Sequence, residues 1–322
     1  MLMLLALVGA LASARADCNA CFRGVCHVKK VVLEGFRVTD QLAIDRTNNI
    51  LYAQLDYRTA AIFLDEARMR TVHDLNSTGL TVDQKNQVLY SSLNGVIYKH
   101  IYQEHGYATE TAFKLDRPTT PARLRYEDVL YMINKDGSSA YYHENSNSFA
   151  GYNNLENYAV SDMANVQNIT NWFFVSGNKL YRYVEDYYRI SWHLISGNKH
   201  ILSIGKHGDV YFGAADEKVI YKLDRETMEL AKYGDYMDGW VVDFVFDRDE
   251  NIVFLDANGS VARWVPSGGA CIESFQNSIA NHAEVVLDSD GQNSRDRAVV
   301  KGYANDHLID WHKISDQIND SN

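Results

Sequence analysis

Short runs of strand-like residues recur along this chain at a nearly constant spacing, and each run holds an aliphatic or aromatic residue followed directly by an aromatic one. Successive pairs lie 38, 41, 43, 37 and 43 residues apart. A period near forty is the length that a four-stranded propeller blade uses. The pattern therefore predicts an all-β chain folded as a six-bladed β-propeller. The six pairs are Leu51-Tyr52, Leu89-Tyr90, Leu130-Tyr131, Phe173-Phe174, Val210-Tyr211 and Val253-Phe254.

Each repeat divides into strands and polar turns in the same way. β-Branched and aromatic residues alternate between the turns, which is typical of antiparallel strands. Asn94-Gly95 is a strong hairpin signal, because both central positions of that turn need a positive φ. The clearest expected strands are Leu42–Asp45, Ile50–Gln54 and Ala60–Leu64 in the first repeat, Leu80–Asp83, Val88–Ser91 and Val96–Lys99 in the second, and Phe244–Asp247, Ile252–Leu255 and Val261–Trp264 in the sixth.

The N-terminal end of the expected mature chain supplies a closing strand and most of the cysteines. The segment Cys26–Leu33 reads as a strand, and we expect it to complete the last blade. Cys18, Cys21 and Cys26 cluster there, whereas Cys271 stands near the end of the sixth repeat. Every pairing of four cysteines joins Cys271 to this cluster and leaves one local bridge. A bridge from Cys26 to Cys271 would close the ring across some 245 residues. The alternative, a redox or zinc site at Cys18 and Cys21, lacks a thioredoxin-like setting and a second ligand pair.

The first residues have the pattern of a secretory signal. Met1–Leu11 is almost purely apolar and is followed by Ala12-Ser13-Ala14-Arg15-Ala16, which favours cleavage before Asp17. The apolar run is about half the roughly 20 residues that a membrane span needs. We therefore expect residues 1–16 to be a signal peptide and the mature protein to be secreted. Residues 17–312 would form a single propeller domain, with an extension from about 274 and a loose tail at 313–322.

The net charge and the short motifs of the chain limit the kinds of partner that we expect it to bind. The chain has 31 basic and 42 acidic residues, a net charge of −11. Nucleic acids and anionic membranes attract basic surfaces, so neither is expected as a partner. The composition suits a soluble, monomeric extracellular carrier or enzyme. Sequons at Asn76, Asn168 and Asn258 predict glycosylation, and Asn319 lies in a weaker one.

Acidic residues recur at the end of some first strands. Asp45, Asp83 and Asp247 occupy matching positions, and repeats three to five lack the acid. A symmetric ring of metal-binding carboxylates would need an acid in every repeat. We therefore interpret these residues as turn formers that accept backbone hydrogen bonds. Asp288–Asn293 resembles the start of a calcium loop, but Val299 stands where its bidentate glutamate belongs. We predict no metal and no cofactor.

The chain lacks the common catalytic motifs, including G-x-S-x-G, H-E-x-x-H, the P-loop and G-x-G-x-x-G. We therefore expect a protein without enzymatic activity or catalytic residues. The main alternative is a secreted hydrolase acting on a lactone or ester, with a channel metal held by Glu, Asn and Asp from several inner strands. Sequence spacing leaves that arrangement open. A second alternative is a protein-binding module, which would show a broad apolar surface patch.

Aromatic and polar residues gather near the connections that face one end of the expected ring. A flat aromatic ligand needs stacking rings and a cation for any carboxylate. We expect stacking from Trp192, Trp240 or Tyr57, and a carboxylate contact from Lys135. The full set of candidate ligand-binding residues is Gln41, Tyr57, Asn94, Lys135, Trp192, His200 and Trp240.

Two segments carry a resemblance to a known family. Cys26–Gly35 with Gln41–Asp45 resembles the mature N-terminus of the insect, mainly lepidopteran, ommochrome-binding proteins, and Thr81–Tyr90 with Asn94–Lys99 resembles their second repeat. The resemblance extends to about Trp264. It implies a haemolymph carrier of ommochromes, the phenoxazinone pigments made from tryptophan, and a xanthommatin-like pigment as partner. It supplies no ligand-contact motif.

Overall fold

A computed structural model describes residues 18–271, except residues 57, 75–76, 116–120, 128, 144–147, 152–154, 166–170, 178, 185–188, 195–199, 225–226, 228 and 238. All described residues belong to the first of two compact units, Met1–Ile279. They include no helix that is both long and apolar enough to cross a membrane. The expected signal peptide, the extension from about 274, the tail 313–322, the Asp288–Asn293 loop and the sequons at Asn76, Asn168 and Asn319 lie outside the described residues.

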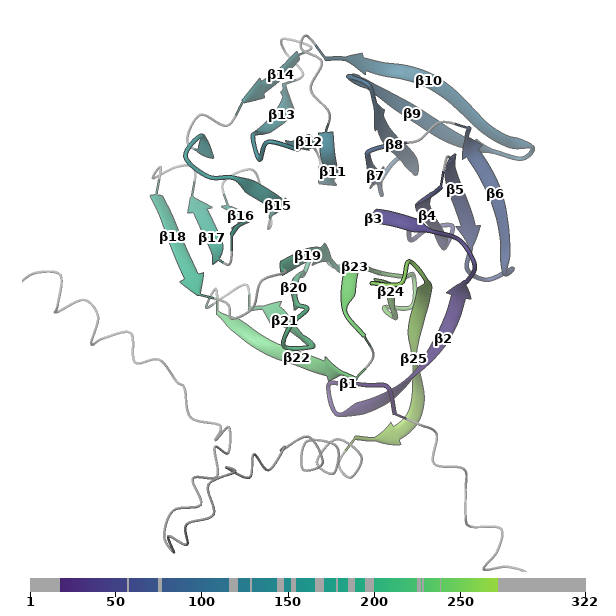
Figure 1. Ribbon diagram of the computed structural model, residues 1–322, viewed down its shortest axis with the longest axis vertical. Coiled ribbons are helices and arrows are strands. Elements are labelled where there is room, and N and C mark those ends of the chain that lie inside the picture. Colours follow the sequence, from purple (N-terminus) through teal and green to yellow (C-terminus); the bar gives the residue numbers. More distant parts are fainter. Residues whose placement is uncertain are drawn as a thin grey trace, which may run out of the picture. The chain divides into compact units, whose positions relative to one another are not determined.

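Antiparallel strands arranged around one axis form the described structure (Figure 1). The first blade contains β3 (Val38–Asp45), β4 (Ile50–Leu55), β5 (Arg58–Phe63) and β6 (Arg68–His73). The second contains β7 (Gly79–Asp83), β8 (Val88–Leu93), β9 (Val96–Gln103) and β10 (Gly106–Lys114). The third contains β11 (Pro121–Glu127), β12 (Val129–Asn134), β13 (Ser139–His143) and β14 (Ser148–Gly151). The fourth contains β15 (Val160–Asn165), β16 (Asn171–Ser176), β17 (Lys179–Val184) and β18 (Arg189–Leu194).

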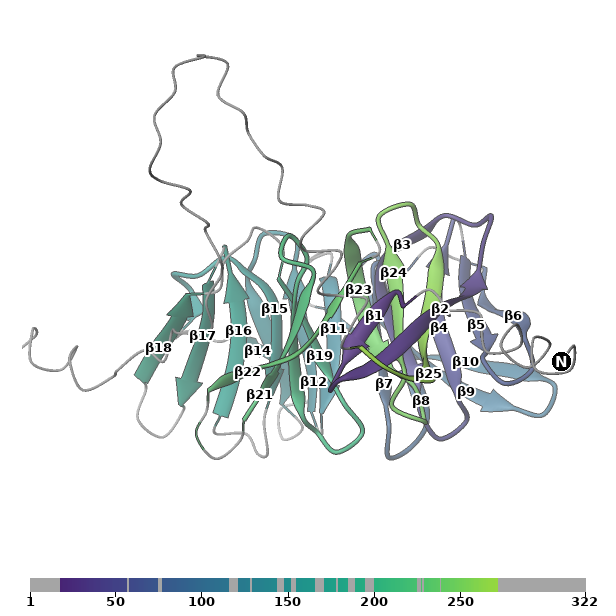
Figure 2. The ribbon, with the colours of Figure 1, turned by 90° about the horizontal axis from the view of Figure 1, so that it is seen from below.

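A nine-stranded sheet completes the ring, and it joins the two ends of the described chain. Its order is β19 (His200–Ile204), β20 (Val210–Ala214), β21 (Val219–Leu223), β22 (Leu230–Tyr236), β1 (Ala20–Phe22), β2 (Val25–Leu33), β25 (Val261–Ala270), β24 (Ile252–Asp256) and β23 (Val241–Phe246). β2 pairs with β25, which confirms the expected N-terminal closing strand. β1 adds a second connection because it pairs with both β2 and β22. The predicted all-β propeller fold is therefore confirmed, and Figure 2 shows its strands running from one end of the ring to the other.

Two disulfides stabilise the closure of the ring. Cys21 bonds to Cys271 and Cys18 bonds to Cys26, so the expected division into one long-range and one local bridge is confirmed. The partner of Cys271, which the sequence left open among the three N-terminal cysteines, is Cys21. The Cys271 N–H donates to the Gly24 carbonyl at 3.1 Å, which places Cys271 at the β1–β2 turn and beside Cys21. Cys26 is left for Cys18.

Four of the apolar-aromatic pairs lie in the second strand of a four-stranded blade, namely β4, β8, β12 and β16, and the other two lie in β20 and β24 of the nine-stranded sheet. Successive residues of a strand point to opposite faces of its sheet. Leu51 and Tyr52 accordingly belong to two different hydrophobic clusters, one on each face of the first blade. Phe173 and Phe174 are divided in the same way. The pair recurs because the centre of each blade is buried on both sides.

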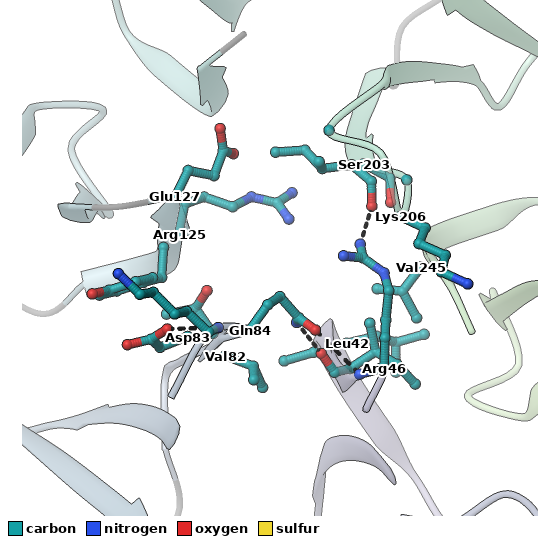
Figure 3. A pocket seen from close by; sticks show the side chains of 18 of the residues that line it. Leu42, Arg46, Val82, Asp83, Gln84, Arg125, Glu127, Ser203, Lys206 and Val245 are labelled. Carbon is teal, nitrogen blue, oxygen red and sulfur yellow. Dashed lines mark hydrogen bonds between the residues drawn. The ribbon is translucent and has the colours of Figure 1, made fainter. Parts of the chain in front are cut away.

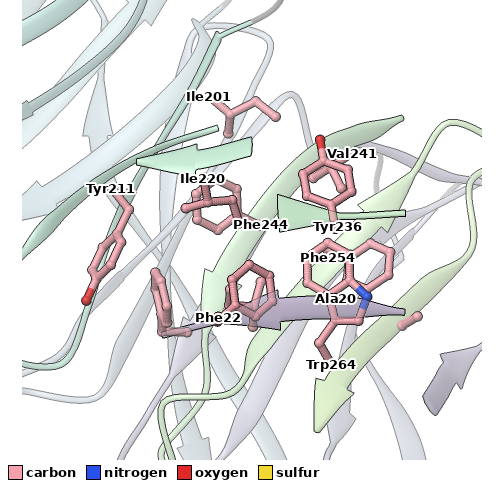
Figure 4. Close-up of a cluster of buried hydrophobic side chains, with 13 residues drawn as sticks. Ala20, Phe22, Ile201, Tyr211, Ile220, Tyr236, Val241, Phe244, Phe254 and Trp264 are labelled. Carbon is pink, nitrogen blue, oxygen red and sulfur yellow. The ribbon is translucent and has the colours of Figure 1, made fainter. Parts of the chain in front are cut away.

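Large rings fill the core between the two halves of the nine-stranded sheet (Figure 4). Trp264 of β25 stacks on Phe254 of β24 with ring centroids 3.9 Å apart, and it also contacts Tyr236 and Phe22. Phe22 comes from β1, so the N-terminal hairpin contributes to this core as well as to the sheet. Trp264 and Phe254 are fully buried.

The recurring aspartates form turns. The Asp45 carboxylate accepts hydrogen bonds from the backbone N–H and the side-chain amide of Asn48, at 3.1 and 2.7 Å. Asp83 does the same with Asn86, at 3.0 and 2.7 Å. Asp247 accepts from the backbone N–H of Asn251 at 2.8 Å. The turn interpretation of these three residues is confirmed.

Candidate functional site

A pocket of about 400 Å³ opens on the axis of the ring, at the end where the inner strands finish (Figure 3). Residues of β3, β7, β11, β15, β19 and β23 line it together with the turns that follow β3, β7 and β19. Charged and polar side chains share its wall with apolar ones. The charged and polar lining residues include Arg46, Asp83, Gln84, Lys85, Arg125, Glu127, Asn165, Ser203 and Lys206.

Polar side chains are needed here because each inner strand is the edge of its sheet. An edge strand has backbone N–H and C=O groups without a neighbouring strand, and buried backbone groups must still be hydrogen-bonded. Four buried side chains do this across the channel, and we call them the inner belt: Gln41, Arg125, Asp162 and Asp243.

Gln41 and Asp243 connect neighbouring inner strands. The Gln41 amide nitrogen donates to the Leu124 carbonyl at 2.9 Å, and its oxygen accepts from the Leu80 N–H at 3.1 Å. Gln41 therefore links β3 to β7 and β11. The Asp243 carboxylate accepts from the Leu42 N–H at 2.7 Å and links β23 to β3. Burial raises the pKa of the Asp243 carboxyl, and Arg123 and Arg125 offset only part of that effect.

Arg125 and Asp162 form the strongest contact in the belt. The guanidinium donates to both carboxylate oxygens at 2.8 to 3.1 Å, in the two-pronged geometry that makes such pairs strong. Arg125 also donates to the Leu202 carbonyl at 2.7 Å, and Asp162 accepts from the Leu202 N–H at 3.1 Å. Burial opposes the charge of Asp162, but Arg125 and Arg123 outweigh it and hold the pKa of this carboxyl below its usual range. Asp162 therefore stays ionised.

β-Bulges aim these side chains into the channel. The register of the innermost strand pair shifts between Val160 and Asp162 in one blade and between Val241 and Asp243 in the nine-stranded sheet. A third shift precedes Arg123. A bulge adds one residue to one strand of a pair and thereby turns the following side chain to a new direction.

Arg46 crosses the end of the channel from the turn after β3. Its Nε donates to the Phe246 carbonyl at 3.2 Å, and its Nη2 donates to the Ile204 carbonyl. The Gln84 side chain fixes its backbone, because it accepts from the Arg46 N–H at 3.1 Å and donates to the Ile44 carbonyl. Among the described residues, no carboxylate oxygen lies within 4.0 Å of the Arg46 guanidinium. Burial lowers the pKa of Arg46, an effect that the more distant Glu250 and Glu127 oppose.

The acidic side chains of the pocket accept hydrogen bonds from backbone N–H groups of the protein. The Asp83 carboxylate accepts from the Lys85 N–H at 3.0 Å as well as from Asn86. Glu127 accepts from the Asn165 N–H at 2.9 Å. Within the part of the chain that is described, no three His, Cys, Asp or Glu side chains are grouped so that they could hold a metal ion.

Four of the candidate residues from the sequence have described side chains and are not among those that line this pocket: Gln41, Asn94, Lys135 and Trp240. Gln41 belongs to the inner belt, and Tyr57 lies outside the described residues. Trp192 is in the outer strand β18, and His200 begins β19. Asn94 and Lys135 are exposed in the β8–β9 and β12–β13 turns, and Trp240, 48% exposed, precedes β23. Those turns, together with the starts of β19 and β23, lie at the end of the ring where inner strands begin, opposite to the pocket.

Sequence reasoning missed Arg46, Arg125 and Asp162. Arg46 follows the recurring aspartate and reads as an ordinary turn residue. Arg125 and Asp162 lie in strands and contact partners 37 to 77 residues away. The one signal was a charged residue inside an otherwise strand-like run.

Comparisons with known proteins support the fold. No family model and no curated protein matches the chain. Among solved structures, it is similar to the WD40 β-propeller domain of Doa1, at 8% identity and a TM-score of 0.55, covering 74% of this chain and 97% of that one. It is also similar to an auxiliary nutrient binding protein from Bacteroides thetaiotaomicron, at 12% identity and a TM-score of 0.53, covering 72% and 69%. A streptogramin B lyase matches at 15% identity and a TM-score of 0.50, covering 70% and 78%.

Proposed function

We propose that this protein is a six-bladed propeller that binds a small organic ligand in its axial pocket and carries it without transforming it. The strand order supports the blade count. β19–β22 and β23–β25 with β2 each make a group of four strands, and β1 joins the two groups into one sheet.

The axial pocket is the observation that carries this proposal. Its volume of about 400 Å³ falls in the range of small-molecule sites, roughly 300 to 1,000 Å³. Tyr126 of β11 is among the lining residues, and its ring stacks on Tyr90 of β8, with centroids 5.6 Å apart and planes 10° apart. The wall also offers cations for an acidic ligand.

The resemblance to ommochrome-binding proteins suggests a tryptophan-derived pigment of the xanthommatin type as this ligand. Such a pigment combines fused rings with acidic groups, and the acidic groups would suit the cations of the pocket. Two disulfides are typical of oxidising compartments and support secretion into an extracellular fluid such as haemolymph. Asn258 is exposed at the β24–β25 turn, so its sequon is open to glycosylation.

A hydrolase with a channel metal is the rival function. The two acids that line the pocket, Asp83 and Glu127, accept backbone hydrogen bonds, and the described residues contain no group of three His, Cys, Asp or Glu side chains that could hold a metal. The neighbours of similar fold include a lyase and a binding protein, and likeness at this identity bears on fold alone.

Titration with xanthommatin tests the proposal. We expect one site, micromolar affinity or better, a shifted visible band and a pigment recovered unchanged. Filling the pocket with Ser203→Phe should abolish binding, whereas Trp240→Ala at the opposite end should leave it intact. Circular dichroism and thermal melting of both variants check the fold. Absence of both heat and spectral change with folded protein rejects xanthommatin as the ligand, and chelator-sensitive turnover of a lactone or ester substrate would establish the hydrolase.

A further inference from the structure

We infer that Arg46 is the anchor of an oxyanion-binding site, so that the ligand of the axial pocket carries a carboxylate or a chemically similar anion. This inference rests on the proposed function, because it assumes that the pocket binds a ligand. It adds the chemical class of that ligand and the residue that selects it.

The first argument is the missing counter-ion. Arg125 bonds to Asp162 at 2.8 Å, Arg123 lies 3.5 Å from Asp162, and Arg263 lies 3.1 Å from Asp247. Arg46 is largely enclosed in the same region, and the described residues supply it with carbonyl oxygens only. Buried charges in proteins are paired, since an unpaired charge loses its hydration without compensation. A bound anion would complete the pair.

The second argument is preorganisation. A guanidinium carries five N–H donors, and the two hydrogen bonds described above hold Arg46 in place while leaving three donors for a ligand. Gln84 fixes the backbone from which this side chain extends. A cation that is already held in position loses little conformational freedom on binding, which favours affinity.

The third argument is the charge around the pocket. Lys85 and Lys206 add two cations to its wall. The carboxylates of Asp83 and Glu127 each accept hydrogen bonds from backbone N–H groups. Arg46 and Arg125 extend into the pocket from opposite sides (Figure 3). In a protein of net charge −11, the pocket lining thus holds four cationic side chains against the two acidic ones, and Arg125 is the cation among them that pairs with Asp162. Such a pocket favours anionic ligands over neutral ones of the same shape.

The test compares two probes of one shape and different charge, naphthoate and naphthamide, by calorimetric titration at neutral pH. We expect wild-type protein to bind naphthoate at least about tenfold more tightly than naphthamide. Arg46→Gln should abolish this preference. Arg46→Lys, which keeps the charge and loses the planar fork, should retain part of it. Lys30→Gln, which removes an exposed cation from β2 and does not line the pocket, is the matched control and should change the preference less than about threefold.

The outcomes separate the two proposals. Equal binding of both probes by the wild type, binding of neither, or an unchanged preference in folded Arg46→Gln overturns the oxyanion site. If Arg46→Gln does not fold, Arg46→Lys decides, since an undiminished preference in that variant rejects the fork geometry proposed here. A preference for naphthoate together with failure to bind xanthommatin keeps this site and rejects the pigment. If the Arg46→Gln variant binds xanthommatin as tightly as the wild type does, the pigment proposal stands and the oxyanion site is rejected.

Discussion

Replacing Cys21 and Cys271 by alanine removes a bridge between residues 250 positions apart, whereas replacing Cys18 and Cys26 removes one between residues 8 positions apart. In the loop-entropy model, a bridge stabilises a protein by limiting its unfolded chain, and the effect grows with the logarithm of the loop length. The model gives about 5.5 kcal/mol for the long loop and about 2.5 kcal/mol for the short one at 25 °C.

Either double variant should still close the ring, because β2 pairs with β25 through the backbone and Phe22 remains in the core. The native fold should therefore persist, and the loss of stability should come from the greater conformational freedom of the unfolded chain. Urea unfolding followed by tryptophan fluorescence measures it, with near-ultraviolet circular dichroism as a check on the native fold. The long-range variant should lose about 3 kcal/mol more than the local one, a difference that follows from loop length. Equal losses, or a larger loss in the local variant, would refute the argument from loop length.

Three further perturbations test the packing and the buried charges. Trp264→Ala should lower the free energy of unfolding by about 3 to 5 kcal/mol in chemical denaturation, because the ring is fully buried against Phe254 and Tyr236; a loss below 1 kcal/mol would contradict this packing. Asp162→Asn should cost about 3 to 5 kcal/mol by leaving Arg125 buried without its carboxylate, and Arg125→Met in the same background should recover part of the loss. His100 is buried between Ser91 and Thr109, and burial lowers its pKa to about 4. The unfolded chain therefore binds the proton first, so stability should fall by about 3 kcal/mol as the pH drops from 6.5 to about 4, and His100→Gln should flatten this part of the stability curve.

Local features of the fold were predictable from the sequence, because their causes are local. The apolar-aromatic pairs located the second strands, and Asp45 and Asp83 located turns through hydrogen bonds to residues two or three positions away. Asn94 adopts the positive φ, 49°, that its hairpin turn requires. The composition of the pocket was not predictable in this way. Arg46 reaches carbonyls 158 and 200 residues away, and no sequence pattern records which distant strand lies opposite a side chain.

The candidate ligand residues show the same limit. The sequence grouped Asn94, Lys135 and Trp240 at one end of a ring, and the topology does place those positions at one end. The sequence could not show which end of the ring holds the pocket. The position of the pocket depends on how closely the inner strands of separate blades approach one another. Contacts between residues far apart in the sequence, such as those of Gln41 with Leu80 and Leu124, determine that approach.

The pairing of β2 with β25 sets the order of events during synthesis. Val28 pairs with Val265, which the ribosome adds 237 residues later. At about 5 to 20 residues per second, β2 waits roughly 10 to 50 s for its partner after it is made. During that interval its edge is open to pairing with other chains, as edge strands generally are. Crowded nascent chains should therefore exchange this strand more readily than any within the four complete blades, so a strand-swapped dimer is the by-product to expect at high expression.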